Sequence, residues 1–256
     1  KKEEEKMIAK LAITDYLRRN SLISITPRAA LIAMDGTLYD SMPSHARAWQ
    51  TMMSEIGIDV PVEEFFMYEG RTGASTINLL FRRAFGRDAT EEECRSLYRR
   101  KTELFQSLPP VEPMPGAREF LDFLRETGVK RVLVTGSGQR TLIDRLNRDF
   151  PGAFSEDLMI TSRDVKKGKP DPEPYLMAAE RAGVRLNDCF VIENAPLGVE
   201  SGHAAGIFTV GVNTGPISPA ALADAGADII YESMPEFAQN LPLLIYEFLT
   251  TMNNCN

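Results

Sequence analysis

The chain has 256 residues and a mass of 28.5 kDa, which is long enough for one large domain or two smaller ones with a substantial core. Its 36 acidic and 29 basic residues give a net charge of -7, which argues against a nucleic-acid or anionic-membrane surface as the main partner. Three widely spaced cysteines argue against a disulfide framework. The absence of a long apolar run argues against a secretion signal and a membrane span. We therefore expect a soluble cytoplasmic protein.

An amphipathic helix is the first predicted element, within residues 3–19. Its apolar residues recur at helical spacing, namely Met7, Ile8, Leu11, Ala12 and Leu17. We expect these side chains to pack the helix against the main fold as an N-terminal extension.

Four short apolar runs, each followed by polar or small residues, are typical of buried parallel strands. They cover 29–34, 131–135, 189–192 and 207–212. Helical patterns are found at 117–127, 139–150, 172–182 and 196–205. Strands that alternate with helices predict an α/β fold with a doubly wound parallel sheet.

Residues 44–108 carry no strand signal and show helical patterns instead, at 44–56, 74–85 and 90–108. Prolines lie at both borders of this segment. We therefore expect a helical cap over 43–109, inserted into an α/β core formed by 28–42 and 110–245. Residues 1–27 form the N-terminal helical extension and 246–256 a C-terminal tail. Because the chain crosses between core and cap twice at one hinge, the cap can open and close.

Polar residues follow the predicted strands at their carboxyl ends, where open parallel sheets bind ligands. The segments are Asp35-Gly36-Thr37, Thr135-Gly136-Ser137, Lys169-Pro170 and Glu193-Asn194. Together they offer carboxylates, hydroxyls, backbone amides and one ammonium group, and we expect them to form one site.

These segments occur in the order of four motifs of the haloacid dehalogenase (HAD) superfamily, which they resemble. The matching stretches are Met34–Asp40, Val134–Ser137, Gly168–Pro170 and Ile192–Val199. The resemblance covers residues 29–244, and the inserted helical cap is similar to that of the β-phosphoglucomutase-like branch. Within this branch, Tyr68–Asn78 and the Glu-Asn-Ala-Pro-Leu-Gly-Val run resemble a bacterial inorganic pyrophosphatase subgroup most closely.

This resemblance implies a phosphohydrolase with a Rossmann-like core that acts on a small phosphorylated compound, most plausibly pyrophosphate. Asp35 corresponds to the family's general acid and base. Thr135, Gly136 and Ser137 correspond to the residues that bind phosphoryl oxygens, and Lys169 to the residue that neutralises their charge.

The resemblance also implies Mg²⁺ as the cofactor, bound by the carbonyl oxygen of Asp35 together with Glu193 and Asn194. Glu193 could alternatively be a charge at a helix N-terminus, and Asn194 a helix N-cap. Many relatives carry an acid at the position of Asn194. An amide adds no negative charge, so we expect the metal site to be weaker than is usual in the family.

The family's nucleophilic aspartate, two residues before Asp35, is replaced by Ala33 in this chain. Three explanations are open: an engineered replacement of the nucleophile, a natural pseudoenzyme, or a mistaken motif. We favour the engineered replacement because every other expected part is present. Without a carboxylate at position 33, no aspartyl-phosphate can form, so we expect negligible turnover.

Three cap residues are further candidates for substrate binding. His45 lies at the start of the first cap helix and either contacts the substrate or has a structural role. Glu69 and Arg71 lie in a glycine-rich loop, and we prefer a role in the site to a surface ion pair because Gly70 and Gly73 allow a close backbone approach.

Two other functions remain open. The first is a sugar-phosphate phosphatase or a β-phosphoglucomutase, and the second is a natural non-catalytic protein that binds a phosphorylated metabolite. The sequence indicates no nucleic-acid or membrane partner. It leaves the oligomeric state open, with a monomer favoured.

Overall fold

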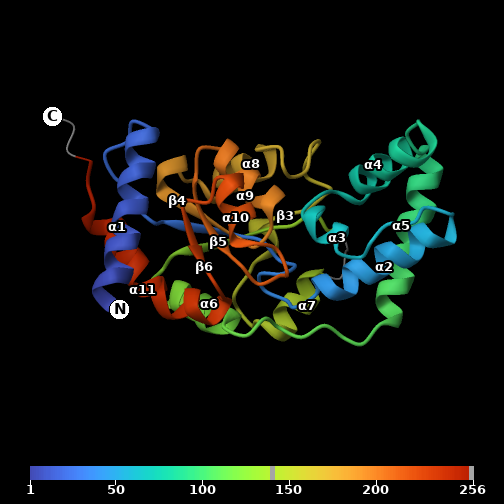
Figure 1. Cartoon of the computed structure of the whole chain (residues 1–256). Helices are drawn as coiled ribbons and strands as arrows, with labels where there is room; N and C mark the ends of the chain where they lie inside the picture. Colours follow the sequence, from blue (N-terminus) through green and yellow to red (C-terminus); the bar gives the residue numbers. More distant parts are fainter. Residues whose placement is uncertain (139–141, 254–256) are drawn as a thin grey trace.

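The computed structural model describes residues 1–138 and 142–253, without the side chain of Leu142. A six-stranded sheet with the order β3-β2-β1-β4-β5-β6 forms its centre, and every neighbouring pair of strands is parallel (Figure 1). The strands are β1 (Ala29–Ile32), β2 (Lys130–Val134), β3 (Met159–Ile160), β4 (Cys189–Glu193), β5 (Phe208–Val212) and β6 (Ile229–Tyr231). The predicted doubly wound α/β fold is confirmed. Within the described residues, no helix combines the length and the apolar character needed to cross a membrane.

Helices cover both faces of the sheet, because alternate residues of each strand point to opposite sides. Ala30 and Ile32 of β1 belong to one apolar cluster, and Ala29 and Leu31 to another. The first face carries α1 (Lys2–Arg19), α6 (Ala117–Glu126), α7 (Leu142–Asp149) and α11 (Met234–Thr250). The second carries α8 (Glu173–Ala182), with α9 (Pro196–Ala204) and α10 (Pro219–Ala225) following along the sheet.

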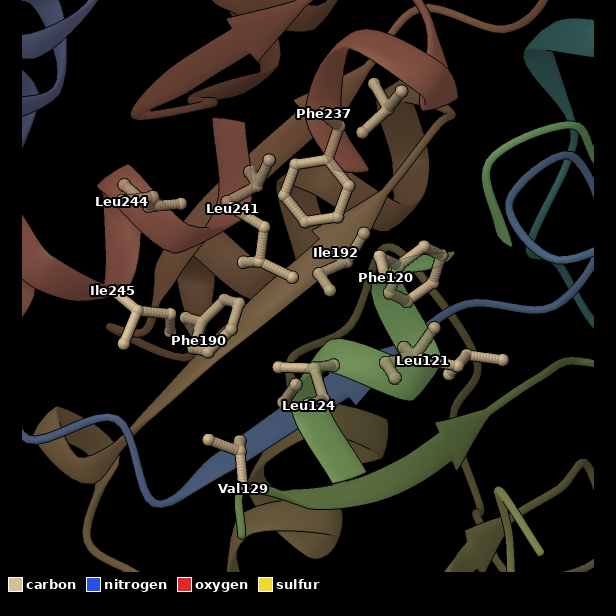
Figure 2. Packing of buried hydrophobic residues seen from close by; sticks show 14 of the residues in the cluster. Phe120, Leu121, Leu124, Val129, Phe190, Ile192, Phe237, Leu241, Leu244 and Ile245 are labelled. Carbon is tan, nitrogen blue, oxygen red and sulfur yellow. The ribbon is translucent and has the colours of Figure 1, made fainter. Parts of the chain in front are cut away.

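The larger cluster lies where α6 and α11 pack on the sheet. Figure 2 shows Phe120 and Leu124 of α6, Phe237 of α11, and Phe190 and Ile192 of β4 in this layer. The rings of Phe120 and Phe237 meet edge to face, with their centroids 5.5 Å apart. This packing holds β4 and β1 in place, and both strands lead into the candidate site.

The cap consists of α2 (Met42–Glu55), α3 (Glu64–Met67), α4 (Gly73–Phe85) and α5 (Glu91–Ser107). The three longer helices agree with the predicted ones to within two residues at each end. The cap has its own apolar core, which includes Met52, Phe65, Ile77, Leu80 and Phe81. It lies at one end of the molecule, and α1 lies at the other (Figure 1).

The N-terminal helix forms as predicted, but the prediction of which side of it packs against the main fold is largely wrong. The residues of α1 that are buried are Ala9, Ile13, Tyr16 and Leu17. Met7, Ile8 and Leu11 are exposed instead, at 62%, 51% and 57%. The helix carries apolar residues on two sides. Packing against α11 buries only the side that begins at Ala9 and continues at positions i+4, i+7 and i+8.

Two boundaries differ from the expected ones. The border at 245/246 between core and C-terminal tail falls inside α11, in which Phe248 is buried and its ring meets the rings of Phe190 and Phe208. The helix predicted over 139–150 is described from Leu142 onward, and its first three residues lie outside the described part of the chain.

Candidate functional site

The loops that follow the central strands meet under the cap at a cavity of about 90 Å³. All residues predicted for the site line this cavity: Ala33, Asp35, His45, Glu69, Arg71, Thr135, Gly136, Ser137, Lys169, Glu193 and Asn194. The parallel arrangement of the strands explains this convergence, since their carboxyl ends share one edge of the sheet.

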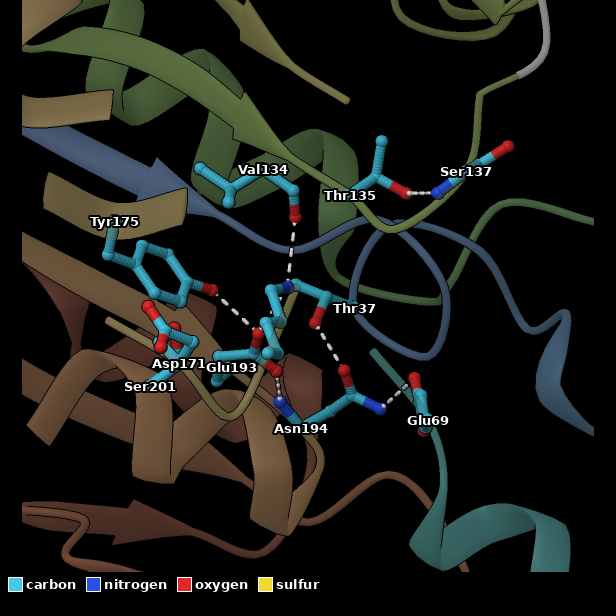
Figure 3. A network of polar contacts seen from close by, with 11 residues as sticks. Thr37, Glu69, Val134, Thr135, Ser137, Asp171, Tyr175, Glu193, Asn194 and Ser201 are labelled. Atoms are coloured by element: carbon cyan, nitrogen blue, oxygen red, sulfur yellow. Dashed lines mark hydrogen bonds and ion pairs between the residues drawn. The ribbon is translucent and has the colours of Figure 1, made fainter. Parts of the chain in front are cut away.

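A buried ion pair lies at the floor of the site. The Nζ of Lys169 donates hydrogen bonds to Oε1 of Glu193 (2.6 Å) and to the carbonyl oxygen of Val134 (3.0 Å). The hydroxyl of Tyr175 donates to the same Oε1 at 2.6 Å, and the amide of Asn194 donates to Oε2 at 3.1 Å (Figure 3). Both oxygens of Glu193 are therefore already engaged, and this carboxylate holds the Lys169 ammonium in place.

Burial and the nearby charge of Glu193 raise the pKa of Tyr175 well above its ordinary value. Tyr175 therefore remains a neutral hydrogen-bond donor. It donates one hydrogen bond to the Glu193 carboxylate, so Lys169 is not the only group that stabilises this buried charge.

Asn194 connects the core to the cap. The hydroxyl of Thr37 donates to its Oδ1 at 2.8 Å, and its Nδ2 donates to Oε1 of Glu69 at 2.8 Å (Figure 3). Glu69 belongs to the loop between α3 and α4. Burial and the charges of Glu193 and Asp35 raise the pKa of Glu69 well above its ordinary value, although the hydrogen bond from Asn194 acts in the opposite direction. The charge of Lys169 also acts in the opposite direction but does not offset this rise.

Asp35 lies next to the cap hinge and accepts two side-chain hydrogen bonds on Oδ1. One comes from the hydroxyl of Ser41 at 2.6 Å, and the other from Nε2 of His45 at 3.0 Å. The Nζ of Lys101 lies 2.7 Å from Nδ1 of His45. Because an ammonium can only donate, this contact makes Nδ1 the acceptor and leaves the proton of a neutral imidazole on Nε2, facing Asp35.

The charges in this chain of contacts affect one another. Burial disfavours the ionised form of Asp35, but His45, Ser41 and Lys101 outweigh burial and hold the pKa of Asp35 well below its ordinary value. Burial and the charge of Lys101 lower the pKa of His45. Burial also lowers the pKa of Lys101 to about 8. The chain thus favours an ionised Asp35 beside a neutral His45.

Lys101 is a site residue that the sequence analysis missed. It lies on the buried face of α5, where the ring of Trp49 is 5.3 Å from Nζ and those of Tyr98 and Phe105 are 5.9 Å and 5.3 Å away. The ring of Phe105 also stacks on His45, with a centroid distance of 4.1 Å. The sequence does contain a sign of this role. Lys101 lies three residues after Tyr98 and four before Phe105, on the same face of a helix, and an apolar helix face rarely includes an unpaired charge.

The opposite wall of the cavity offers donors for an anion. The hydroxyl of Thr135 accepts a hydrogen bond from the amide of Ser137 at 3.1 Å, which fixes the turn after β2. Arg71 donates from Nη1 to the hydroxyl of Ser75 at 2.8 Å. The Nε of Arg71 is buried without a hydrogen-bond partner among the described residues. Together with Lys169, this guanidinium provides positive charge for a phosphate group.

The cap loop touches the core closely because two glycines carry no side chain. A Cβ at Gly136 would lie 2.9 Å from the carbonyl oxygen of Arg71 and 3.0 Å from that of Gly70. At Gly36, where φ is +74°, a Cβ would lie 2.8 Å from Oε1 of Glu69 in the cap loop. The structure therefore shows the cap closed over the site.

A model of the haloacid dehalogenase-like hydrolase family matches residues 28–206. The chain belongs to this family. Among curated proteins, hexitol phosphatase A of Escherichia coli K12 is 30% identical over 189 residues, which cover 74% of this chain and 84% of that protein. The phosphorylated carbohydrates phosphatase of Thermotoga maritima is 31% identical over 201 residues, covering 78% and 91%. A solved structure from Bacteroides vulgatus, named as a beta-phosphoglucomutase, has a TM-score of 0.92 at 49% identity and covers 95% of this chain and 99% of its own.

Membership of the HAD family removes one explanation for Ala33, namely a mistaken motif. Ala33 follows β1, its amide donates to the carbonyl oxygen of Ile192 at 3.1 Å, and it lines the cavity together with Asp35, Thr135 and Lys169. An engineered replacement and a natural loss both remain open.

The oxygen donors near Ala33 fit a hard cation such as Mg²⁺. They are the carboxylate of the partly buried Glu69, Oδ1 of Asn194 and the backbone carbonyl of Asp35. Within the described residues, no three His, Cys, Asp or Glu side chains are grouped so that they could hold a metal. Metal binding at this site would thus depend on amide and backbone oxygens beside the single carboxylate of Glu69, and an aspartate at position 33 would strengthen it.

Proposed function

We propose that this HAD protein binds a small phosphorylated compound together with Mg²⁺, and that it hydrolyses the phosphoryl bond when position 33 carries an aspartate. With Ala33, the chain binds without turnover. The observation that carries this proposal is the convergence of Asp35, Thr135 and Lys169 around Ala33 in one cavity.

The chemistry follows from these positions. An aspartate at position 33 attacks phosphorus with one carboxylate oxygen, the bond from phosphorus to the leaving oxygen breaks, and an aspartyl-phosphate forms. In the ionised form that His45, Ser41 and Lys101 favour, Asp35 takes a proton from the water that hydrolyses the intermediate, and it gives a proton to the leaving oxygen of a substrate only after taking one up. Lys169, with Thr135, neutralises charge on the phosphoryl oxygens. Mg²⁺, when bound, supplies further positive charge between phosphate and carboxylates.

His45 and Lys101 support Asp35 from the cap. The Nε2 of His45 points its proton at Oδ1 of Asp35, and Lys101 fixes the tautomer through Nδ1. Since both residues belong to cap helices, this support is complete only when the cap is closed. Closure would thereby couple substrate binding to the correct position of the acid.

Pyrophosphate is the substrate we propose first. An acidic residue facing a sugar phosphate would repel it, unless a cation lay between them. The second phosphate of pyrophosphate can share Mg²⁺ with Glu69, which resolves this conflict. The cavity of about 90 Å³ is also far below the roughly 300–1,000 Å³ of pockets for larger organic ligands.

A sugar-phosphate phosphatase or a β-phosphoglucomutase is the second candidate. The names of the E. coli, T. maritima and B. vulgatus relatives favour it. Opening of the cap would provide the room that a hexose phosphate needs. A natural protein that binds a phosphorylated metabolite without hydrolysis is the third, and Ala33 favours it if the source gene encodes alanine at that codon.

Phosphate release by the chain and by its Ala33→Asp variant tests these proposals. Each protein is given pyrophosphate and, separately, hexose phosphates, with Mg²⁺ and with EDTA. We expect turnover only in the variant, only with Mg²⁺, and fastest on pyrophosphate. Metal-dependent turnover by the Ala33 protein would refute the assigned nucleophile position, and faster turnover of a hexose phosphate would replace pyrophosphate by the second candidate. Sequencing the source gene at codon 33 distinguishes an engineered from a natural alanine.

A further inference from the structure

A second cavity, of about 270 Å³, lies beside the cavity of about 90 Å³ under the cap. We call the smaller one the site cavity and the larger one the side cavity. The walls of the side cavity come from the hinge, the cap helix α3, the second crossing between cap and core, and the loop after β5. Most of its lining side chains are apolar: Met42, Pro43, Phe66, Met114, Pro216 and Ile217. Mostly apolar walls are typical of pockets for small organic ligands.

A thin wall separates the two cavities. Met42, Glu69 and Asn194 line both of them. The polar part of this wall is one hydrogen bond of 2.8 Å, from Nδ2 of Asn194 to Oε1 of Glu69 (Figure 3). Met42 supplies a flexible apolar side chain. Because one side-chain hydrogen bond contributes little net free energy, a bound molecule can displace this wall and occupy both cavities.

The side cavity closes together with the cap. Its core side is held in place by two hydrogen bonds. The amide of Asp40 donates to the carbonyl oxygen of Glu112 at 3.0 Å, which pairs the two crossings between core and cap. The hydroxyl of Thr214 donates to the carbonyl oxygen of Gly36 at 2.5 Å, which ties the loop after β5 to the site. Phe66, in contrast, belongs to α3 of the cap, so cap movement opens and closes both cavities.

The charge of the side cavity differs from that of the site cavity. Lys169 and Arg71 line the site cavity and provide positive charge for a phosphate group. Among the described residues that line the side cavity, none is a lysine, an arginine or a histidine, and the ionisable ones, Asp40 and Glu69, are both acids. An anionic group would find no cation there and would face these acids. The side cavity therefore fits an uncharged group, and not a second phosphate or a carboxylate.

We propose that the side cavity binds the alcohol part of a small phosphate monoester whose phosphate occupies the site cavity, and that this alcohol is uncharged and partly apolar. The inference rests on the proposed function and develops its second candidate, whereas pyrophosphate leaves the side cavity unused. The position agrees with the proposed chemistry, because Gly36 lines the side cavity and directly follows Asp35. An ester oxygen at the border of the two cavities therefore lies near the proposed acid.

The size and the polar groups of the side cavity define the kind of alcohol further. With the wall displaced, the two cavities together reach the lower end of the roughly 300–1,000 Å³ found for small-molecule sites. Phe66, Met114 and Ile217 offer apolar contact. The exposed Asp40 can accept hydrogen bonds from hydroxyl groups. Alkyl and polyol groups of a few carbons meet these conditions.

Calorimetric titration of the Ala33 chain, for which we expect binding without turnover, tests this inference. The ligands are orthophosphate, pyrophosphate, and methyl, propyl and pentyl phosphate, each with Mg²⁺. From methyl to pentyl phosphate, we expect the affinity to rise by up to about fourfold for each added CH₂ group, because each one enters an apolar cavity. A propyl phosphate whose chain ends in a carboxylate should bind at least about tenfold more weakly than propyl phosphate.

Two variants of the side cavity make the test specific. Ile217→Trp fills the side cavity, and should abolish the gain from longer chains while orthophosphate binds as it does to the parent chain. Asp40→Lys places a cation in the side cavity, and should reverse the preference between propyl phosphate and its carboxylate-ended analogue. Asp224→Lys is the matched control, because it makes the same change at an exposed residue of α10 that lines neither cavity. Circular dichroism confirms that each variant remains folded.

The outcomes separate this inference from the proposed function. An affinity that does not rise with chain length, or a rise that Ile217→Trp leaves intact, would overturn the inference, while orthophosphate binding would still support the proposed function. Tighter binding of the carboxylate-ended ester by the parent chain, or an unchanged preference in Asp40→Lys, would also overturn the inference. A parent chain that binds neither orthophosphate nor pyrophosphate would overturn the proposed function, and this inference with it.

Discussion

Glu69 of the cap accepts a hydrogen bond of 2.8 Å from Nδ2 of Asn194, which directly follows β4 of the core. On the core side, the hydroxyl of Thr37 donates to Oδ1 of the same amide at 2.8 Å. The closed cap thus contributes a partly buried carboxylate to a cavity that Lys169 and Arg71 also line. We attribute this unusual pairing to a cation that Glu69 and the substrate would share.

Replacing Glu69 by alanine tests this relationship. In the Ala33→Asp background, Glu69→Ala should reduce pyrophosphate hydrolysis and weaken the apparent affinity for Mg²⁺ by roughly 10- to 100-fold, the range found for groups that support a metal site. Slow hydrolysis of a simple phosphate monoester should change little. Phosphate release as a function of Mg²⁺ concentration measures both effects. The exposed Glu63→Ala is the control, and unchanged pyrophosphate hydrolysis in Glu69→Ala would lead us to abandon this substrate.

Asp35→Asn probes the proton-transfer role. The amide retains acceptor capacity toward Ser41 and His45, so folding should be preserved. In the Ala33→Asp background, turnover should fall by about 10²- to 10⁴-fold. The loss should be larger for a sugar phosphate than for pyrophosphate, since an alkoxide needs a proton to leave and phosphate leaves as a stable anion. Steady-state kinetics on both substrates measure this, and full activity would remove Asp35 from the acid/base role.

A methyl group at position 136 should interfere with cap closure. In Gly136→Ala, the new Cβ would lie 2.9 Å from the carbonyl oxygen of Arg71, so the cap loop has to move away. We expect weaker binding of pyrophosphate with Mg²⁺ by the Ala33 protein, and little change in the free energy of unfolding. Calorimetric titration measures the binding. Gly215→Ala is the control, because its nearest neighbour would lie 4.0 Å away, and equal binding by both variants would contradict the closed arrangement.

Lys101 should make stability depend on pH in the alkaline range. Burial lowers its pKa from the ordinary 10.5 to about 8 in the folded protein. Between these values the unfolded chain binds the proton and the folded chain does not, so this residue's contribution to stability falls as pH decreases from 10.5 to 8. The total is of the order of 3 kcal/mol. Urea unfolding across this range should show a steeper pH dependence for the parent chain than for Lys101→Met, whereas the exposed Lys167→Met should match the parent.

Much of the fold and of the site's chemistry could be inferred before any coordinates. The apolar runs at 29–34 and 189–192 are short, buried and followed by Asp35 and Glu193, which was enough to predict parallel strands with a site at their carboxyl ends. The helical cap was visible because strand patterns are missing from 44–108. These are local signals of periodicity and order along the chain, and they do not require knowledge of packing.

The partners of each side chain could not be inferred in this way. Lys101 and His45 are 56 positions apart in the sequence, and only the packing of α5 on α2 brings Nζ to Nδ1. Glu193 was predicted as a metal ligand, yet in the structure both of its carboxylate oxygens are occupied by Lys169, Tyr175 and the amide of Asn194. Such contacts depend on distances between separate elements, which periodicity does not contain.

The N-terminal helix shows the same division most clearly. The spacing of its apolar residues was sufficient to predict a helix within 3–19, because an α-helix depends on local backbone hydrogen bonds and side-chain propensities. It was not sufficient to predict the buried side, since both Leu11 and Ile13 are apolar. The position of α11 decided that Ile13 enters the core and Leu11 remains on the surface, because a helix can bury only the side that meets another element.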